Sequence, residues 1–590
     1  MTACAALLLA AAAQQAPADT AHFQQGVEYR IEARLDEAAE VLHARALLRY
    51  ENRSPFTLDT LWLHLHLNAF RPHSRWAERE LEYGERRFTD LGPDEHAFER
   101  LTRVAVGGRS IAPVYPLAPD STVVGFPLPR ALATGDTLTV EMDWDARPST
   151  LPRRQGRRDR HYDFAQWYPR LAVVDRGGWR VQPLMPQGEF YGEFGSFDVT
   201  LELAADQVVG ATGVPVDGDP GWAAARHPQS AEPWYRRDFY ASEPAERLGL
   251  LQGAPTAGRK QVRWRADAVH HFAWSTNPEY GYDGGRWEDI AIHVLFQPGD
   301  DDWVEDHTAL ERTRVALTWF HELFGDFPWP QLTNLHRIEG GGTEFPMMVM
   351  DGSASQGLIL HEVAHNYVHG IFGNNEWLEG WLDEGFASFL TAWWSQEHEG
   401  GDPWAGAMRS VVQREQAGAT QPIGLPGADF VDPGTYSAMT YTKPQLVYRM
   451  LRWLMGEEDF RRGLRTYFAL HQLQHVREAD FRASMEAWHP EPLDWFFAQW
   501  IHTTDQLDYQ LGDASLTQEG GRWVATVEVI RAGDIWMPVD LQVGDQVRRL
   551  ESRERTQTVR FTLDARPAEA VLDPERVLID VQPDNNRRAF

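Results

Sequence analysis

The stretch that decides the fold reads HEVAHNYVHGIFGNNEWLEGWLDEGFASF, residues 361–389. It begins inside an apolar segment, Leu358 to Tyr367, whose composition favours a helix. A helix turns by about 100° per residue, so the imidazoles of His361 and His365 project from one face and can both reach one metal ion. The competing interpretation is a helix that carries two surface histidines and binds no metal.

A catalytic zinc ion usually takes three protein ligands and keeps one position for water. Glu384 is the third candidate ligand, 19 positions after His365, in the helix-like segment WLDEGFASFL (residues 381–390). Two neutral imidazoles and one carboxylate leave Zn²⁺ with a net positive charge, which lowers the pKa of bound water toward about 7. Glu362 follows a ligand without being one, so it is placed to take the proton of that water. The sequence therefore predicts a hydrolytic site with one Zn²⁺ per chain.

These residues resemble the zinc aminopeptidases of the alanyl aminopeptidase and leukotriene hydrolase type, within the gluzincins. That family carries HExxH, then eighteen residues, then Glu, and residues 361–389 follow this pattern. The resemblance covers about residues 25–505 and is weaker beyond them. It implies an amino-terminal β domain, a thermolysin-like catalytic domain, and peptide substrates that have a free amino terminus.

The segment upstream of the histidines resembles a second family motif, a Gly-x-Met-Glu-Asn strand. At that place the chain reads Gly341-Gly342-Thr343-Glu344-Phe345-Pro346, and Glu344 lies 17 positions before His361. The resemblance implies that Glu344 grips the α-ammonium group of the substrate. A carboxylate suits this task because it pairs with the ammonium and brings the first peptide bond to the metal. Gly341 and Gly342 fit an edge strand that a substrate backbone approaches closely.

A third family motif, Tyr-x-Lys-Gly, has its counterpart in Tyr441-Thr442-Lys443-Pro444, 57 residues after Glu384. The resemblance implies that the Tyr441 hydroxyl donates a hydrogen bond to the developing oxyanion. The proline that replaces glycine is compatible with the first turn of a helix. Tyr436 lies where some relatives have a tyrosine that lines the substrate site; a loop aromatic without substrate contact is the competing interpretation.

The rest of the chain changes from strand to helix periodicity and back. Apolar and polar residues alternate from Val27 to Leu35 and from Leu61 to Leu67, whereas Leu310, Leu317, Phe320 and Phe324 share a helical face. Alternation returns after about residue 506, which indicates a β-sandwich. We expect a multidomain α+β protein with an antiparallel β domain (20–250), a thermolysin-like catalytic domain with following helices (251–505) and a carboxy-terminal β-sandwich (506–590).

Composition excludes several classes of function. The formal charge of −30 repels phosphate backbones and anionic lipids, so we expect neither nucleic-acid binding nor binding to a membrane surface. Five arginines between Arg153 and Arg160 form a basic cluster that is most simply a solvated loop. The only cysteine, Cys4, rules out a disulfide framework and a cysteine nucleophile in a mature chain.

The amino terminus resembles a signal peptide. Residues 3–13 form an apolar run that is too short to span a bilayer, and no other stretch is long enough to do so. We expect residues 1–16 to direct the protein to the periplasm or the medium; the alternative is a frayed apolar terminus on a cytoplasmic protein. The sequence gives no indication of oligomeric state, of the preferred first residue or of the physiological substrate.

Three functions remain consistent with these motifs. The first is an aminopeptidase in which Glu344 anchors the amino terminus. The second is a zinc endopeptidase, because only about 85 residues follow the expected catalytic domain and a large helical covering domain is missing. The third is a non-catalytic binding protein on the same scaffold, which has no need to keep ligands, base and tyrosine at these spacings.

Overall fold

The computed structural model describes residues 23–240, 247–251 and 253–590. The chain divides into two compact units: the first runs to Trp377 and includes Leu470–Val476, and the second comprises Leu378–Ala469 and Arg477–Phe590. The expected signal peptide, residues 1–16, lies outside the described residues together with Cys4. Among the described residues, no helix is both long and apolar enough to cross a membrane.

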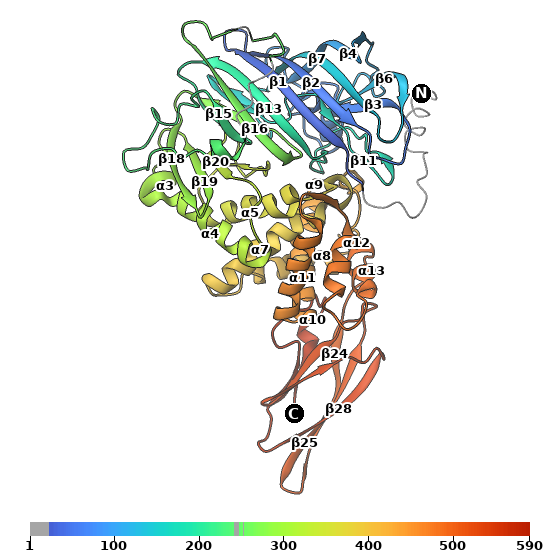
Figure 1. Ribbon diagram of the computed structural model, residues 1–590. Coiled ribbons are helices and arrows are strands. Elements are labelled where there is room, and N and C mark those ends of the chain that lie inside the picture. The colour runs from blue at the N-terminus through green and yellow to red at the C-terminus, as the bar shows by residue number, and fades with distance from the viewer. Residues whose placement is uncertain (1–22, 241–246, 252) are drawn as a thin grey trace. The chain divides into compact units, whose positions relative to one another are not determined.

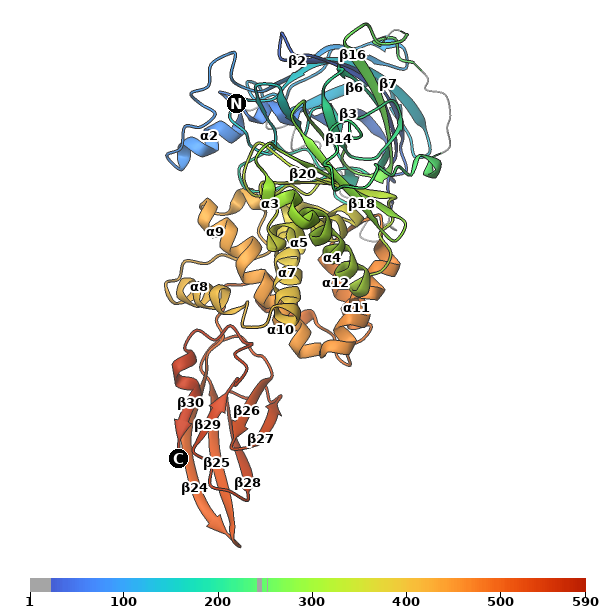
Figure 2. The same cartoon turned by 90° about the vertical axis from the view of Figure 1, so that its left-hand side faces the viewer.

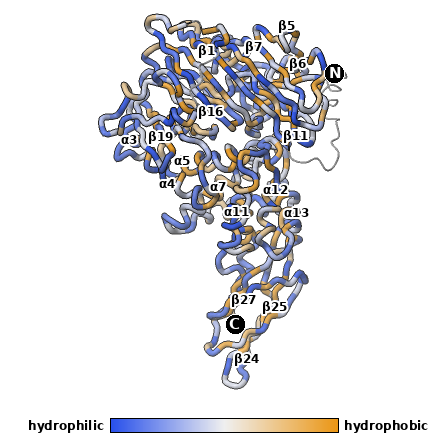
Figure 3. Tube along the Cα trace, viewed as in Figure 1, coloured by the Kyte–Doolittle hydropathy of each residue, from blue (hydrophilic) through white to orange (hydrophobic). Residues whose placement is uncertain are grey.

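An eight-stranded sheet dominates the first unit (Figure 1). Its central strand β1 (Gly26–Asp36) pairs antiparallel with β2 (Val41–Glu51) and parallel with β13 (Gly195–Ala204). Apolar and polar residues alternate along these strands, as the tube in Figure 3 shows, and the apolar side chains of β1 are buried. The remaining strands of this sheet are β4 (Phe98–Val106), β5 (Arg109–Ser110), β7 (Thr137–Arg147), β15 (Val214–Asp217) and β16 (Arg259–Val269).

Three smaller sheets complete the amino-terminal part of the first unit. The alternation expected to run to Leu67 ends earlier, because β3 (Leu58–His64) stops at His64 and Leu61 to Leu67 are buried on both faces. The sheets also extend beyond the expected boundary at residue 250, since β16 pairs with β13 and β15. The strands involved are β3, β6 (Val123–Leu132) and β10 (Arg170–Leu171); β8 (Gly156–Arg158), β9 (His161–Phe164), β14 (Val208–Ala211) and β17 (Trp274–Asn277); and β11 (Val174–Asp175) with β12 (Gly178–Trp179).

The first unit continues with a four-stranded sheet and the helices that carry the histidine motif. The sheet has the order β18 (Gly281–Trp287), β19 (Ile290–Phe296), β20 (Gln331–His336) and β21 (Met348–Asp351). Helix α4 (Thr308–Leu323) buries the apolar face predicted from its sequence. Helix α5 (Gln356–His365) follows β21 and continues into a π-helical turn, Asn366–Ile371. Short strands β22 (Phe372–Asn374) and β23 (Gln474–Val476) pair in parallel.

Helices and a β-sandwich form the second unit. Helices α7 (Glu384–His398) and α10 (Lys443–Met455) pack against each other through stacked rings of Phe386 and Tyr448, whose centroids are 4.5 Å apart. The aromatic face of α13 (Asp494–His502) is buried core. The other helices are α8 (Ala405–Gln416), α9 (Pro433–Ser437), α11 (Glu457–His471) and α12 (Glu478–Glu486).

The carboxy-terminal strands form two sheets, as expected for a sandwich (Figure 2). One sheet contains β24 (Tyr509–Glu519), β25 (Arg522–Arg531) and β28 (Thr556–Leu563). The other contains β26 (Val539–Val543), β27 (Gln546–Leu550), β29 (Glu569–Leu572) and β30 (Arg587–Ala589). The expected multidomain α+β fold is confirmed.

Candidate metal centre and active site

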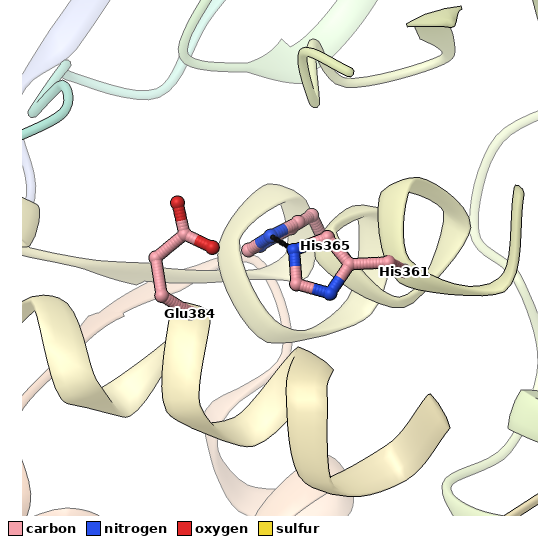
Figure 4. A group of neighbouring side chains, drawn as sticks. All are labelled: His361, His365 and Glu384. Atoms are coloured by element: carbon pink, nitrogen blue, oxygen red, sulfur yellow. Dashed lines mark hydrogen bonds between the residues drawn. The ribbon is translucent and has the colours of Figure 1, made fainter. Parts of the chain in front are cut away.

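Helix α5 presents the two predicted histidine ligands from one face. Its apolar residues, among them Leu360 and Val363, are buried, and this burial fixes the orientation of the helix. The Nε2 atoms of His361 and His365 lie 3.2 Å apart (Figure 4). His365 is only 1% exposed, whereas His361 is partly exposed. Two imidazole nitrogens that converge in this way fit a shared metal ion of the zinc type.

Glu362, the predicted general base, is buried beside a glycine hairpin of the same unit. A Cβ atom on Gly342 would lie 2.0 Å from Oε1 of Glu362, so only glycine leaves room for this carboxylate. The hairpin is defined by backbone hydrogen bonds in both directions between Thr343 and Met350. These bonds place the predicted edge segment alongside β21, the last strand of its sheet. The backbone at Gly342 therefore lies close to the Glu362 carboxylate, at the edge of the sheet.

Glu344, the predicted amine anchor, is buried and lies near a guanidinium group. The Nη1 atom of Arg154 is 3.5 Å from Oε1 of Glu344, and the same guanidinium is ion-paired with Glu189. The basic cluster is therefore only in part the solvated loop that the sequence suggested, because Arg158 is exposed but Arg154 and Arg157 are buried. Arg154 is 8% exposed, and the equally buried Arg157 pairs with Glu40 at 2.9 Å. The reason is that these guanidinium groups meet acidic partners that are distant in sequence.

Two further carboxylates and a histidine belong to this part of the first unit, and the sequence motifs did not reveal them. The carboxylates of Glu189, Glu344 and Glu376 each offer an oxygen atom within 4.8 Å of the other two. Glu376 lies 2.7 Å from Nδ1 of His369 and accepts a hydrogen bond from the backbone N–H of Phe190. The signal available in the sequence was weak: Glu189 and Glu376 each stand in an aromatic-rich segment, GEFYGEF and NNEWLEGW.

In the second unit, Glu384 is the first residue of α7 and is buried (Figure 4). Its backbone N–H donates to the side chain of Asp383 at 2.6 Å, which caps the helix. A carboxylate in the first turn is stabilised by the helix dipole. The next residue, Gly385, permits close packing of α7 on α10, because a Cβ atom there would lie 2.4 Å from Pro444.

The Tyr441 hydroxyl donates a hydrogen bond to Oε1 of Glu384 at 2.5 Å. Tyr441 lies in a π-helical turn, Ala438–Thr442, that leads directly into α10. The structure thus brings the predicted third metal ligand and the predicted oxyanion donor into contact within one unit. Tyr441 is half-buried, so its hydroxyl lies at the boundary between core and solvent.

Two neighbours support the Tyr441 turn from inside the second unit. Tyr436 is buried in a cluster with Phe430, at 5.6 Å between ring centroids, and its ring lies 6.3 Å from that of Tyr441. Lys443 is 1% exposed and pairs with the 2% exposed Glu415 at 2.8 Å. Lys443 therefore anchors the turn to α8.

Comparison with known proteins finds similarity to peptidases in the segment that carries these residues. The model of the peptidase family M1 domain matches residues 347–500. Aminopeptidase N of Streptomyces lividans is 24% identical over 315 residues, which cover 49% of this chain and 34% of that protein. The puromycin-sensitive aminopeptidase of Caenorhabditis elegans is 26% identical over 267 residues, which cover 40% of this chain and 27% of that protein. The chain thus spans about a third of the length of these curated relatives.

Two solved structures share the fold. The aminopeptidase A of Legionella pneumophila, solved with aspartic acid, aligns over 96% of this chain and 60% of its own, with a TM-score of 0.63 and 12% identity. A point mutant of an M1 zinc metallopeptidase from Deinococcus radiodurans aligns over 82% of this chain and 95% of its own, with a TM-score of 0.55 and 15% identity. The match over residues 347–500, which include both histidines, Glu362 and Glu384, makes this segment of the chain similar to the peptidase family M1 domain.

Proposed function

We propose that this protein is a zinc-dependent aminopeptidase that hydrolyses the first peptide bond of peptides with a free amino terminus. The observation that carries this proposal is the contact between the glycine hairpin and Glu362. It sets the general base against Gly342, two residues before the buried carboxylate of Glu344. Because the base on α5 packs against the hairpin that carries the amine anchor, the distance between the amino terminus and the reacting bond is fixed.

We further propose that His361, His365 and Glu384 hold one Zn²⁺ per chain. Two imidazoles and a carboxylate are the donor set of many catalytic zinc sites, and the two Nε2 atoms already face each other at 3.2 Å. Zinc bound there supplies a Lewis acid that polarises the substrate carbonyl and lowers the pKa of water.

The residues of the chain then have separate tasks in the reaction. Glu362 takes a proton from the attacking water and delivers it to the nitrogen of the departing amine. The Tyr441 hydroxyl turns from Glu384 to the oxyanion that develops on the first carbonyl. Glu344 pairs with the α-ammonium group and sets the register, with Gly341 and Gly342 giving the substrate backbone a close approach.

The test counts zinc per chain and compares free-amine with amino-acetylated versions of one peptide panel, for the unaltered protein and for Glu344→Gln. We expect close to one zinc per chain, cleavage of free-amine peptides only, and a strong loss in Glu344→Gln. The matched control is Glu311→Gln, an exposed glutamate on α4 of the same unit. Equal cleavage of acetylated peptides would establish an endopeptidase, and zinc binding without any cleavage would establish a binding protein.

We also propose export to the periplasm or the medium. The proposal is supported by the apolar run at residues 3–13 and the small residues that follow it. The test is the amino-terminal sequence of protein recovered from the periplasm or the medium: export predicts a new terminus near residue 16. An uncleaved chain that stays in the cytoplasm would contradict it.

A further inference from the structure

Arg154 is held rigidly in the first unit. Its backbone is in the left-handed region, with φ of 58°, and its N–H donates to Oε2 of Glu339 at 2.6 Å. Its guanidinium lies 5.0 Å from the centre of the Phe190 ring. A non-glycine residue rarely adopts this backbone conformation unless its surroundings impose it. The surrounding structure therefore holds the Arg154 backbone in a strained conformation, and this fixes the position of its side chain.

That place is a cluster of three buried carboxylates. Glu189, Glu344 and Glu376 bring carboxylate oxygens within 4.8 Å of one another, and Glu376 is paired with His369. The Arg154 guanidinium forms a close ion pair with Glu189, and its Nη1 atom lies 3.5 Å from Oε1 of Glu344. A carboxylate has about four acceptor positions, so Glu344 keeps capacity for a second cation.

We propose that Arg154 is a positioning residue for the substrate's amino terminus: it neutralises Glu189 and holds the Glu344 carboxylate in place to receive the α-ammonium group. This inference rests on the proposed aminopeptidase function. Two facing carboxylates without the guanidinium repel each other, so one of them turns away or takes up a proton. In either case Glu344 loses the fixed negative charge that pairs with the ammonium.

A second role for Arg154, reading an acidic first side chain of the substrate, is less well supported. Its guanidinium is buried, already contacts two carboxylates and stacks on Phe190. A substrate carboxylate would have to displace one of these partners. The experiment separates the two roles by including substrates with neutral and with acidic first residues.

The test uses the zinc-loaded full chain with alanyl and glutamyl 4-nitroanilides, and compares Arg154→Met, Glu189→Gln and the double variant. We expect Arg154→Met to raise KM for the alanyl substrate about tenfold or more while kcat changes by less than about threefold. Glu189→Gln alone raises KM as well, because the guanidinium then moves to Glu344 and competes with the ammonium. The double variant restores KM to within about threefold of the unaltered enzyme, because neither the extra acid nor the competing cation remains.

Arg157→Met is the matched control. It removes another buried arginine of the basic segment 153–160, one that pairs with Glu40, and we expect KM to stay unchanged. Arg154→Lys keeps the charge and gives a KM between those of the unaltered enzyme and Arg154→Met. If the Arg154 variants do not fold, Glu189→Gln decides alone, since an unchanged KM in that variant overturns the proposal. So does a KM increase in Arg154→Met that Glu189→Gln fails to relieve.

Two further outcomes are informative. A loss confined to the glutamyl substrate overturns the positioning role and assigns Arg154 to the recognition of acidic side chains. If the unaltered zinc-loaded enzyme cuts no free-amine substrate, the proposed function fails, and this inference fails with it. If that enzyme is active and depends on Glu344 but not on Arg154, only the inference is wrong.

Discussion

The two units of the chain contribute different kinds of polar chemistry. In the first unit, the carboxylates of Glu189, Glu344 and Glu376 lie close together; Arg154 contacts Glu189 and Glu344, and the His369 ring contacts Glu376. In the second unit, Glu384 accepts a hydrogen bond from the neutral hydroxyl of Tyr441. Lys443 and Glu415 form a buried ion pair there.

The difference indicates a division of labour. In the proposed reaction, the first unit keeps negative charge available for the substrate's ammonium group and provides the base and two imidazoles. The second unit provides one carboxylate and one hydroxyl donor on a turn that an ion pair and aromatic packing hold in place. Charge thus dominates the candidate residues of the first unit and rigid support those of the second, and this contrast can be tested one residue at a time.

The largest effect is expected for the base of the first unit. Glu362→Gln keeps the shape of the side chain but cannot accept the proton, so kcat should fall by about 10³-fold. Zinc per chain should be unchanged because Glu362 is not a ligand. The control is Glu322→Gln, an exposed position on α4. A Glu362→Gln enzyme that retains a tenth of its activity would show that the base lies elsewhere.

The next largest effect is expected on stability, when the buried Lys443–Glu415 ion pair of the second unit is broken. Lys443→Met leaves Glu415 buried without its cation, at a cost of about 3 kcal/mol or more in the free energy of unfolding measured with urea. Arg462→Met removes an exposed pair with Glu458, whose side chains are 45% and 79% exposed, and should cost about 0.5 kcal/mol or less.

The double variant Lys443→Met/Glu415→Leu sharpens this prediction. With both charges removed, no buried charge is left unpaired, so most of the lost stability should return. A cost for Lys443→Met no larger than that for Arg462→Met would contradict the idea that this ion pair holds the Tyr441 turn.

A smaller effect is expected when the Tyr441 hydroxyl of the second unit is removed. Tyr441→Phe removes the hydrogen bond to Glu384 and the proposed donor to the oxyanion, so kcat should fall by about 10²-fold with little change in KM. Tyr467→Phe, a buried tyrosine on α11, is the control and should stay close to the unaltered enzyme. A Tyr441→Phe effect on KM alone would assign this residue to substrate binding.

The smallest effect is expected for the hairpin of the first unit. A Cβ atom on Gly342 displaces the Glu362 carboxylate, so Gly342→Ala should lower kcat/KM about tenfold or more. Gly340→Ala is the control, because no atom lies within 4 Å of a Cβ there. Similar activity in both variants would show that the backbone at Gly342 does not fix the position of the base.

The sequence was sufficient wherever covalent spacing sets geometry. Four positions along a helix place His361 and His365 on one face, and their Nε2 atoms do converge. Alternation predicted β1 correctly, because a half-buried strand repeats every two residues. It failed at Leu65 and Leu67, where both faces are buried and the pattern carries no information about where the strand ends.

Only the tertiary structure showed the charge cluster around Glu344. Arg154 reads as one of five solvated arginines in the sequence, yet it lies beside a carboxylate 190 positions further along the chain. Likewise, nothing local links Glu189 to Glu376. Motif spacing was enough to predict His361, His365 and Glu362 as candidate site residues, because one turn of a helix relates them. Which buried charges compensate one another was decided by sheet topology, because a guanidinium leaves water only where distant strands and loops bring its partners to it.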